Sequence, residues 1–365
     1  MKKFIFLITI TCLQIIGYGQ YLAAYNDYLQ RFWAFEAGTF KQLEHLEIQE
    51  FQVGGIVIAY IDNGSNLKVY RNGEVENLMQ GAPIKFEATD YLLGYSMYEQ
   101  LNVYDNGNKQ VLSTSCDGYI IKDSLIAWHD RIQNTIDVYY NGQTTTILDG
   151  LIYNPLGKFK AGDNTLAFVH TSSKSFYLFY LGELQILDDF VQELRFEAGR
   201  DIVAYIDVPD QAFYVFFRGE IIELESFAPK SFHVGDEIVA WVDNLGKLKL
   251  FDNGEITILS TYEPKYYYVN DRVLVFEEQG FFKTYCNGEI YVIERYEPQP
   301  YILDYNTIAY LDQNRFVKVF QNCESKPISF IPVKEISLIR DLVIYVEGVN
   351  KTKIYFNGEV YEYLK

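Results

Sequence analysis

Residues Lys230–Ser260 read KSFHV-GD-EIVAWVD-NLG-KLKLFD-NG-EITILS, and this stretch decides the fold. Asn253-Gly254 separates two runs in which apolar and polar residues alternate. This is a strong signal of a β-hairpin, because both central residues of a type I′ turn need a positive φ. Gly235-Asp236 and Asn244-Leu245-Gly246 mark two further turns. The stretch therefore predicts four short antiparallel strands, of which the second is continuously apolar.

The same unit recurs along the chain. Asn-Gly or a close variant is found at Asn72-Gly73, Asn106-Gly107, Asn141-Gly142, Leu181-Gly182, Arg218-Gly219, Asn253-Gly254, Asn287-Gly288, Asn322-Cys323 and Asn357-Gly358, in steps of 34 to 40 residues. One more step back reaches Ala37-Gly38, whose flanking residues resemble those of Asn253-Gly254. A fixed period of this length indicates a repeat architecture. We therefore expect ten units of about 35 residues in a single array.

A small residue followed by an aromatic one marks the second strand of most units. These pairs are Ala24-Tyr25, Ala59-Tyr60, Gly94-Tyr95, Ala127-Trp128, Ala167-Phe168, Ala204-Tyr205, Ala240-Trp241 and Ala309-Tyr310. Continuous apolar strands with interlocking large and small positions are typical of sheets that are buried on both faces. The pattern predicts that each sheet packs between two neighbouring sheets, and it argues against a cofactor site built from these aromatics.

Such sheets can close into a ring, which is a β-propeller. A parallel β-helix also repeats, but its coils do not place a hairpin in every unit. The unit resembles the WD-repeat and related bacterial propeller families, although it lacks their Gly-His and Trp-Asp dipeptides. The resemblance implies an all-β propeller of nine or ten four-stranded antiparallel blades and a mode of partner binding. It carries over no catalytic residue.

The ends of the array leave the number of blades open. The last unit ends after its outermost strand, at Tyr361–Lys365, whereas the first begins at its second strand, Tyr21–Tyr25, with no inner strand before it. Residues 21–35 also fit an amphipathic helix. Ten blades, or nine full blades with a partly helical or strand-like cap within residues 20–50, are both compatible with the sequence.

The first nineteen residues have the features of a bacterial secretory signal. Lys2 and Lys3 precede the apolar run Phe4–Ile16, and Gly17 and Gly19 supply small residues before a cleavage near Gly19-Gln20. The residue before Cys12 is not small, which argues against a lipoprotein signal. We expect residues 1–19 to be removed and residues 20–365 to form one exported domain, in the periplasm, at the cell surface or outside the cell. No later run is long enough to span a bilayer.

Composition excludes several classes of function. The chain has 365 residues, of which 49% are apolar and 17% aromatic, so it can bury a large core. Its formal charge is −18 and no cluster of Lys and Arg stands out, so we expect no nucleic-acid partner. Beyond the signal, Cys116, Cys286 and Cys323 are too few and too scattered for a disulfide framework or a zinc site. A Cys286–Cys323 bridge is the one pairing worth testing.

Motifs for catalysis, metals or cofactors are missing. His45, His129, His170 and His233 occupy different positions in their units, and none is at metal-ligand spacing from another. Neither Gly-x-Ser-x-Gly nor a phosphate loop occurs. We therefore predict no catalytic residue, no metal and no cofactor.

One column of acidic residues is a candidate binding surface. Eleven or twelve residues before the hairpin glycine lie Asp27, Asp62, Asp130, Asp207, Asp243, Glu277, Asp312 and Glu347, with Ser96 and His170 in the other two units. Each ends a second strand, so in a propeller they share a face with the blade-to-blade loops. A carboxylate there can simply accept backbone N–H groups of its turn. The alternative is a ring of negative potential suited to a basic segment, a cationic ligand or weakly held Ca²⁺. Blade spacing favours electrostatic recognition over a metal cage.

The loops of this face also carry exposed aromatic and proline residues, such as Tyr153–Gly157, Tyr262–Pro264 and Tyr296–Pro300. Such loops on a rigid scaffold are typical of binding surfaces. We expect a non-catalytic, monomeric scaffold that binds a protein or glycan partner through this acidic face. One alternative is a carbohydrate hydrolase or lyase with its site on this same loop-bearing face, at the mouth of the central channel, which would need convergent acid/base groups there. The other is a component of envelope assembly held by a membrane partner.

Overall fold

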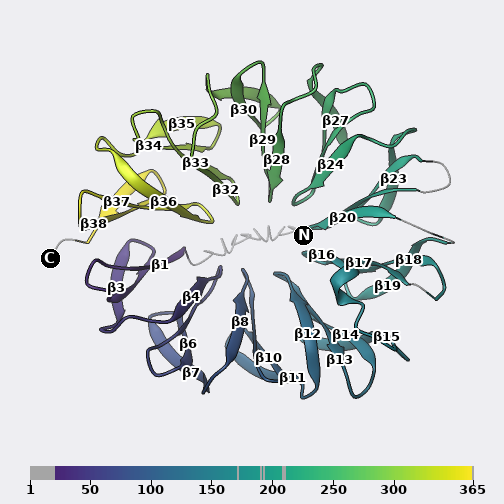
Figure 1. Ribbon diagram of the computed structural model, residues 1–365, viewed down its shortest axis with the longest axis horizontal. Coiled ribbons are helices and arrows are strands. Elements are labelled where there is room, and N and C mark those ends of the chain that lie inside the picture. The colour runs from purple at the N-terminus through teal and green to yellow at the C-terminus, as the bar shows by residue number, and fades with distance from the viewer. Residues whose placement is uncertain (1–20, 171, 190, 192–193, 208–210, 364–365) are drawn as a thin grey trace, which may run out of the picture.

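The computed structural model describes residues 21–170, 172–189, 191, 194–207 and 211–363; the predicted signal lies outside these residues. Ten antiparallel sheets stand around a central channel, and the chain passes through them in order (Figure 1). They are called blades 1 to 10. Nine have four strands in sequential order, and blade 1 has three within the described residues. The predicted all-β propeller is confirmed.

The strand nearest the channel comes first in blades 2 to 10. These inner strands are β4 (Glu50–Val53), β8 (Ile84–Ala88), β12 (Cys116–Ile121), β16 (Lys160–Gly162), β20 (Arg195–Gly199), β24 (Ser231–Val234), β28 (Tyr267–Asn270), β32 (Tyr301–Asp304) and β36 (Val333–Ile339). One short 3₁₀ helix, η1 (Leu156–Lys158), precedes β16 in the longest step of the repeat.

The second and third strands form the buried middle of each blade. The second strands are β1 (Leu22–Asn26), β5 (Ile58–Ile61), β9 (Leu92–Met97), β13 (Leu125–Asp130), β17 (Thr165–His170), β21 (Ile202–Ile206), β25 (Ile238–Val242), β29 (Val273–Glu278), β33 (Thr307–Leu311) and β37 (Leu342–Glu347). The third strands are β2 (Phe32–Glu36), β6 (Asn66–Arg71), β10 (Gln100–Asp105), β14 (Thr135–Tyr140), β18 (Ser175–Tyr180), β22 (Phe213–Phe217), β26 (Leu248–Asp252), β30 (Phe281–Cys286), β34 (Val317–Gln321) and β38 (Lys351–Phe356).

The fourth strand is the outer edge of each blade and is largely exposed. These strands are β3 (Thr39–Glu44), β7 (Glu74–Gln80), β11 (Asn108–Ser113), β15 (Gln143–Leu148), β19 (Glu183–Asp188), β23 (Glu220–Glu225), β27 (Glu255–Ser260), β31 (Glu289–Glu294), β35 (Glu324–Pro327) and β39 (Glu359–Glu362). The hairpin before β27 has the predicted geometry, because Asn253 and Gly254 have φ values of 50° and 89°.

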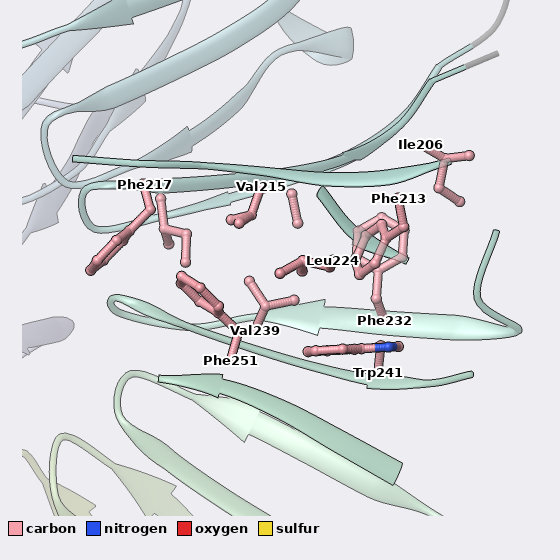
Figure 2. Packing of buried hydrophobic residues seen from close by; sticks show 11 residues of the cluster. Ile206, Phe213, Val215, Phe217, Leu224, Phe232, Val239, Trp241 and Phe251 are labelled. Carbon is pink, nitrogen blue, oxygen red and sulfur yellow. The ribbon is translucent and has the colours of Figure 1, made fainter. Parts of the chain in front are cut away.

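The core lies between blades rather than inside any one of them. Between blades 6 and 7, Phe213 and Val215 of β22 meet Val239 and Trp241 of β25. Phe232 of β24 packs beside Phe213 and Trp241 (Figure 2). Ala240 and Trp241 are both fully buried because they point to opposite faces of their sheet, each of which packs on a neighbouring blade. The predicted interlocking of small and aromatic residues is thus present.

Blade 1 forms from the segment for which the sequence left a helix open. Residues 22–26 and 32–36 are strands β1 and β2, not a helix. The ring closes where blade 1 packs against blade 10: the ring centroids of Tyr21 and Phe356 lie 4.8 Å apart and those of Trp33 and Tyr363 lie 4.4 Å apart. Aromatic side chains therefore join the first and last blades.

The Cys286–Cys323 bridge is present and links the outer hairpins of blades 8 and 9, with 5.6 Å between the two Cα atoms. Cys116 is a buried free thiol, and burial raises the pKa of this thiol to about 11. Within the described residues, no helix is long and apolar enough to cross a membrane.

Candidate functional site

The turns between first and second strands gather at one end of the channel. They surround a cavity of about 360 Å³. Its acidic groups are Glu87, Asp90, Asp123, Asp163, Asp236, Asp271 and Asp304, and its basic groups are Lys122, Arg200 and Arg340. We call this region the channel mouth. It lies on the face opposite to the blade-to-blade loops, because successive antiparallel strands alternate in direction.

Glycine allows these turns to touch one another. A Cβ on Gly199 would lie 1.8 Å from the carbonyl oxygen of Gly235, and one on Gly162 would lie 2.1 Å from that of Gly199. Real Cβ atoms do not approach backbone so closely, so a side chain at either position would push two blades apart. The glycines are needed here for close approach and not for a special φ.

Hydrogen bonds join the turns of neighbouring blades around the mouth. The backbone N–H of Asp90 donates to Oδ1 of Asp123 (2.7 Å), and that of Asp123 donates to Oδ1 of Asp163 (2.9 Å). On the other side of the ring, the N–H of Tyr305 donates to Asp271 and that of Arg340 to Asp304. The carboxylates therefore help to hold blades together.

Arg200 occupies the centre of one carboxylate group. Its Nη2 lies 3.0 Å from Oδ2 of Asp163, 3.0 Å from Oδ2 of Asp236 and 3.6 Å from Oδ2 of Asp123. These three aspartates come from three different blades, and Arg200 comes from a fourth. The mouth thus already binds one guanidinium in a site made of several blades.

Burial raises the pKa values of several carboxyl groups of the mouth, among them those of Asp123, Asp236 and Asp304. It raises the pKa of Asp236 to about 6 even though Arg200 opposes the shift. Burial also raises the pKa of Asp123 well above its ordinary value, and the neighbouring Asp163 and Asp90 add to this. The pKa of Asp304 is raised in the same way by burial and by Asp271. Like charges crowded in a partly desolvated ring favour the protonated form.

The sequence-predicted column lies at the other face, in the turns between second and third strands. Asp243 accepts the N–H groups of Leu245 (2.9 Å) and Lys247 (2.8 Å) and lies 3.1 Å from Nζ of Lys249. Asp62 and Asp312 accept N–H groups from their own turns in the same way. Asp62 and Asp243 are 8% and 4% exposed, so their oxygens face the protein more than solvent.

A lysine of the third strand completes this arrangement in blades 2, 7 and 9. Lys68, Lys249 and Lys318 each lie between the column aspartate of their own blade and a glutamate that ends the preceding blade, Glu44, Glu225 or Glu294 respectively. The same glutamates accept hydrogen bonds from Tyr60, Trp241 and Tyr310. Burial alone would raise the pKa of Asp62, but Lys68 and Asn66 outweigh it and lower that pKa to about 2.

The remaining column members are also bonded locally. Asp27 accepts hydrogen bonds from the side chains of Arg31 and Trp33, and Asp130 accepts them from Ser113 and Ser115. Glu277 accepts the backbone N–H of Gly280, and Glu347 forms an ion pair with Lys353. The backbone N–H of Asp207 donates to the carbonyl oxygen of Ala212. The described contacts of these residues stay within one blade or reach the preceding one, so the structure does not bring the column carboxylates together. Their role in partner binding stays a prediction.

Sequence reasoning missed the channel mouth. A repeat column does mark it, since Asp90, Asp123, Asp163, Arg200, Asp236 and Asp271 follow one another at steps of 33 to 40 residues. We interpreted Gly235-Asp236 only as a turn. In the described part of the chain, no three His, Cys, Asp or Glu side chains are arranged to hold a metal ion.

One family model matches nearly the whole chain. Residues 18–361 match a family model described as a 10-bladed beta propeller domain. No curated protein matches the sequence. The computationally designed Ika8 protein is similar at a TM-score of 0.38 and 12% identity, over 93% of this chain and 100% of the other. The CRINKLY WD40 ectodomain of the Arabidopsis thaliana receptor kinase ACR4 has a TM-score of 0.35 and 10% identity, over 67% and 94% of the two chains.

Proposed function

Because the chain belongs to the family of 10-bladed β-propeller domains, we propose that it is an exported, non-catalytic scaffold that binds a basic segment of a partner protein at the channel mouth. The observation that carries this proposal is the excess of carboxylates over cations in the mouth. Seven acidic side chains surround three basic ones, so the cavity attracts positive charge. The export part rests on the signal-like sequence of residues 1–19.

The geometry around Arg200 supports the same ligand chemistry. Its guanidinium is held by three carboxylates of three blades, which is how an arginine or lysine of a partner would be held. Asp271 and Asp304 form a second carboxylate group in the mouth, and no ion pair within the described residues supplies it with a cation. We assign the incoming cationic side chain to this second group. The acidic column on the loop-bearing face stays a further predicted contact surface.

The test uses a hexa-arginine peptide and isothermal calorimetry at low salt. The double variant Asp271→Asn/Asp304→Asn should bind the peptide at least tenfold more weakly than the native protein. A matched control, Glu220→Gln/Glu255→Gln, removes two exposed charges from the outer hairpins of the same face and should change affinity less than twofold. Equal losses in both variants would show only non-specific attraction and would contradict the proposal.

A carbohydrate hydrolase or lyase is the second candidate, and one observation favours it. The mouth gathers several buried carboxyl groups with raised pKa values, and a general acid working near neutral pH needs such a group. Release of reducing ends from a panel of polysaccharides, lost in Asp123→Asn but kept in Glu220→Gln, would establish this function instead. Absence of turnover with peptide binding intact would favour the scaffold.

A further inference from the structure

A group of basic side chains lies at the opposite end of the channel, on the loop-bearing face. Lys158 of η1, Lys160 of β16 and Arg195 of β20 line one hollow of about 440 Å³. They come from blades 5 and 6, with η1 supplied by the long connection between blades 4 and 5. We call this the blade 5–6 hollow.

These three cations are uncompensated in the described structure. Elsewhere in this acidic chain, lysines of the repeat such as Lys249 lie between two carboxylates. By contrast, the side chains of Lys158 and Lys160 have no ion pair or hydrogen bond within the described residues, and Arg195 only covers the ring of Phe232, 5.2 Å from its centroid. Three unpaired cations in one concavity create a positive potential, which attracts a negatively charged ligand.

Among the described residues, one carboxylate, that of Glu197, lines the hollow beside these three cations. Oε2 of Glu197 accepts the backbone N–H of Val234 (3.1 Å) and lies 3.9 Å from Nδ1 of His233. These contacts leave the negative charge of Glu197 in place, so it offsets one of the three positive charges. The surplus of positive charge in the hollow remains.

The rest of the lining is apolar. Val169, Leu194, Phe196 and Phe232 form the walls between the cations. A second hollow of about 240 Å³ shares Lys158 and Val169 with the first. Its lining combines Leu151, Phe159 and the exposed Ile152 with the polar residues Asp149 and His170. Concave sites with apolar walls and a few charged groups bind small amphipathic molecules.

We propose that the blade 5–6 hollow binds a small organic carboxylate with an apolar body. Arg195 and Lys160 bind the carboxylate. The planar guanidinium of an arginine can donate two charge-assisted hydrogen bonds to it, and the ammonium group of a lysine adds a further positive charge. The apolar body lies against Phe196 and Val169. The site differs from the channel mouth in its face, its residues and the sign of its charge, so either proposal can fail without the other.

The test compares 2-naphthoate with its neutral analogue 2-naphthamide, by calorimetry on the full-length protein without its signal. The native protein should bind the carboxylate at least tenfold more tightly than the amide. Lys160→Gln/Arg195→Gln should lose this preference, and Phe196→Ala should weaken both compounds. Lys265→Gln/Lys334→Gln is the matched control, because it removes two exposed lysines from the same face outside the hollow.

Three results would overturn the proposal: no binding of 2-naphthoate by the native protein, equal affinity for the two compounds, or an equal loss in the control variant. The melting temperatures of all variants should lie within about 2 °C of that of the native protein, which is the size of change that a surface substitution causes. A change in affinity then reports on the site and not on folding.

Discussion

The guanidinium of Arg340 in blade 10 lies 3.2 Å from the carboxylate of Asp90 in blade 3, across the backbone of Gly55 in blade 2. A Cβ on Gly55 would lie only 2.7 Å from Nη1 of Arg340. Blade 1 contributes no inner strand within the described residues. This ion pair therefore joins the inner turns of blades 10 and 3 across the place where blades 10 and 1 close the ring. Closure of the ring thus combines aromatic packing outside with an ion pair inside.

Arg340→Ala should destabilise the protein by roughly 2 kcal/mol, since it leaves Asp90 without its cation in a partly buried place. The control is Lys109→Ala, whose partner Glu76 is half exposed and whose loss should cost less than about 1 kcal/mol. Urea denaturation measures both. Equal effects would mean that Arg340 has no special part in closure.

Gly199→Ala should cost about 3 kcal/mol or more, because the new methyl group collides with the backbone of Gly235 in the next blade. Gly157→Ala is the control, as its Cβ would meet no atom within 4 Å and its φ is not positive. Thermal unfolding of the two variants gives the comparison, and a native-like melting temperature for Gly199→Ala would refute the close contact.

Trp241→Ala should cost about 3–5 kcal/mol, because it opens a cavity between blades 6 and 7 and leaves Glu225 without the indole N–H. Trp241→Phe keeps most of the volume and should cost less. Leu245→Ala, at an exposed turn position, should have almost no effect. Denaturant titration followed by Trp128 and Trp33 fluorescence can measure all three.

Cys286→Ser/Cys323→Ser should lower stability by about 4 kcal/mol in the chain-entropy description of a loop of this length. The unfolding midpoints of the native protein and of the double variant are measured under oxidising and under reducing conditions. Reduction should lower the midpoint of the native protein and leave that of the variant unchanged. A response to reductant in the variant would assign the effect to another group.

Stability should be greatest in mildly acidic solution. Asp123, Asp236 and Asp304 in the mouth have raised pKa values, that of Asp236 to about 6. The folded chain therefore holds more protons than the unfolded chain above about pH 4 and loses stability as pH rises through that window. Asp62, with its pKa lowered to about 2, loses its contribution as pH falls below about 4.

Between pH 4 and pH 8, the free energy of unfolding of Asp236→Asn should fall by roughly 2 kcal/mol less than that of the native protein. Unfolding midpoints across this range measure the slope. Glu220→Gln serves as the control, because Glu220 is exposed on an outer strand. An unchanged slope in Asp236→Asn would show that the mouth does not set the pH dependence.

Local sequence determined the blade and its repetition. Asn253-Gly254 can adopt the two positive φ values of its turn, so each unit defines its own hairpin. Ala240 and Trp241 must be buried on opposite faces of their sheet, so each unit requires a neighbouring sheet on both sides. The Cys286–Cys323 pairing was within reach for the same reason, since equal steps place equivalent hairpins side by side. The conformation of residues 21–35 could not be predicted, because a short amphipathic run fits helix and strand alike. Packing of both faces, on blade 2 and on blade 10, selects the strand.

Only the tertiary structure decided where charge gathers. Asp243 looked like a member of an acidic ring, yet its own turn and Lys249 engage it, because a strand-end carboxylate finds local N–H groups first. Asp123, Asp163 and Arg200 belong to different blades and meet only because the inner turns converge on the axis. Spacing along the chain fixes which residues are equivalent, but distance from the axis fixes which of them touch.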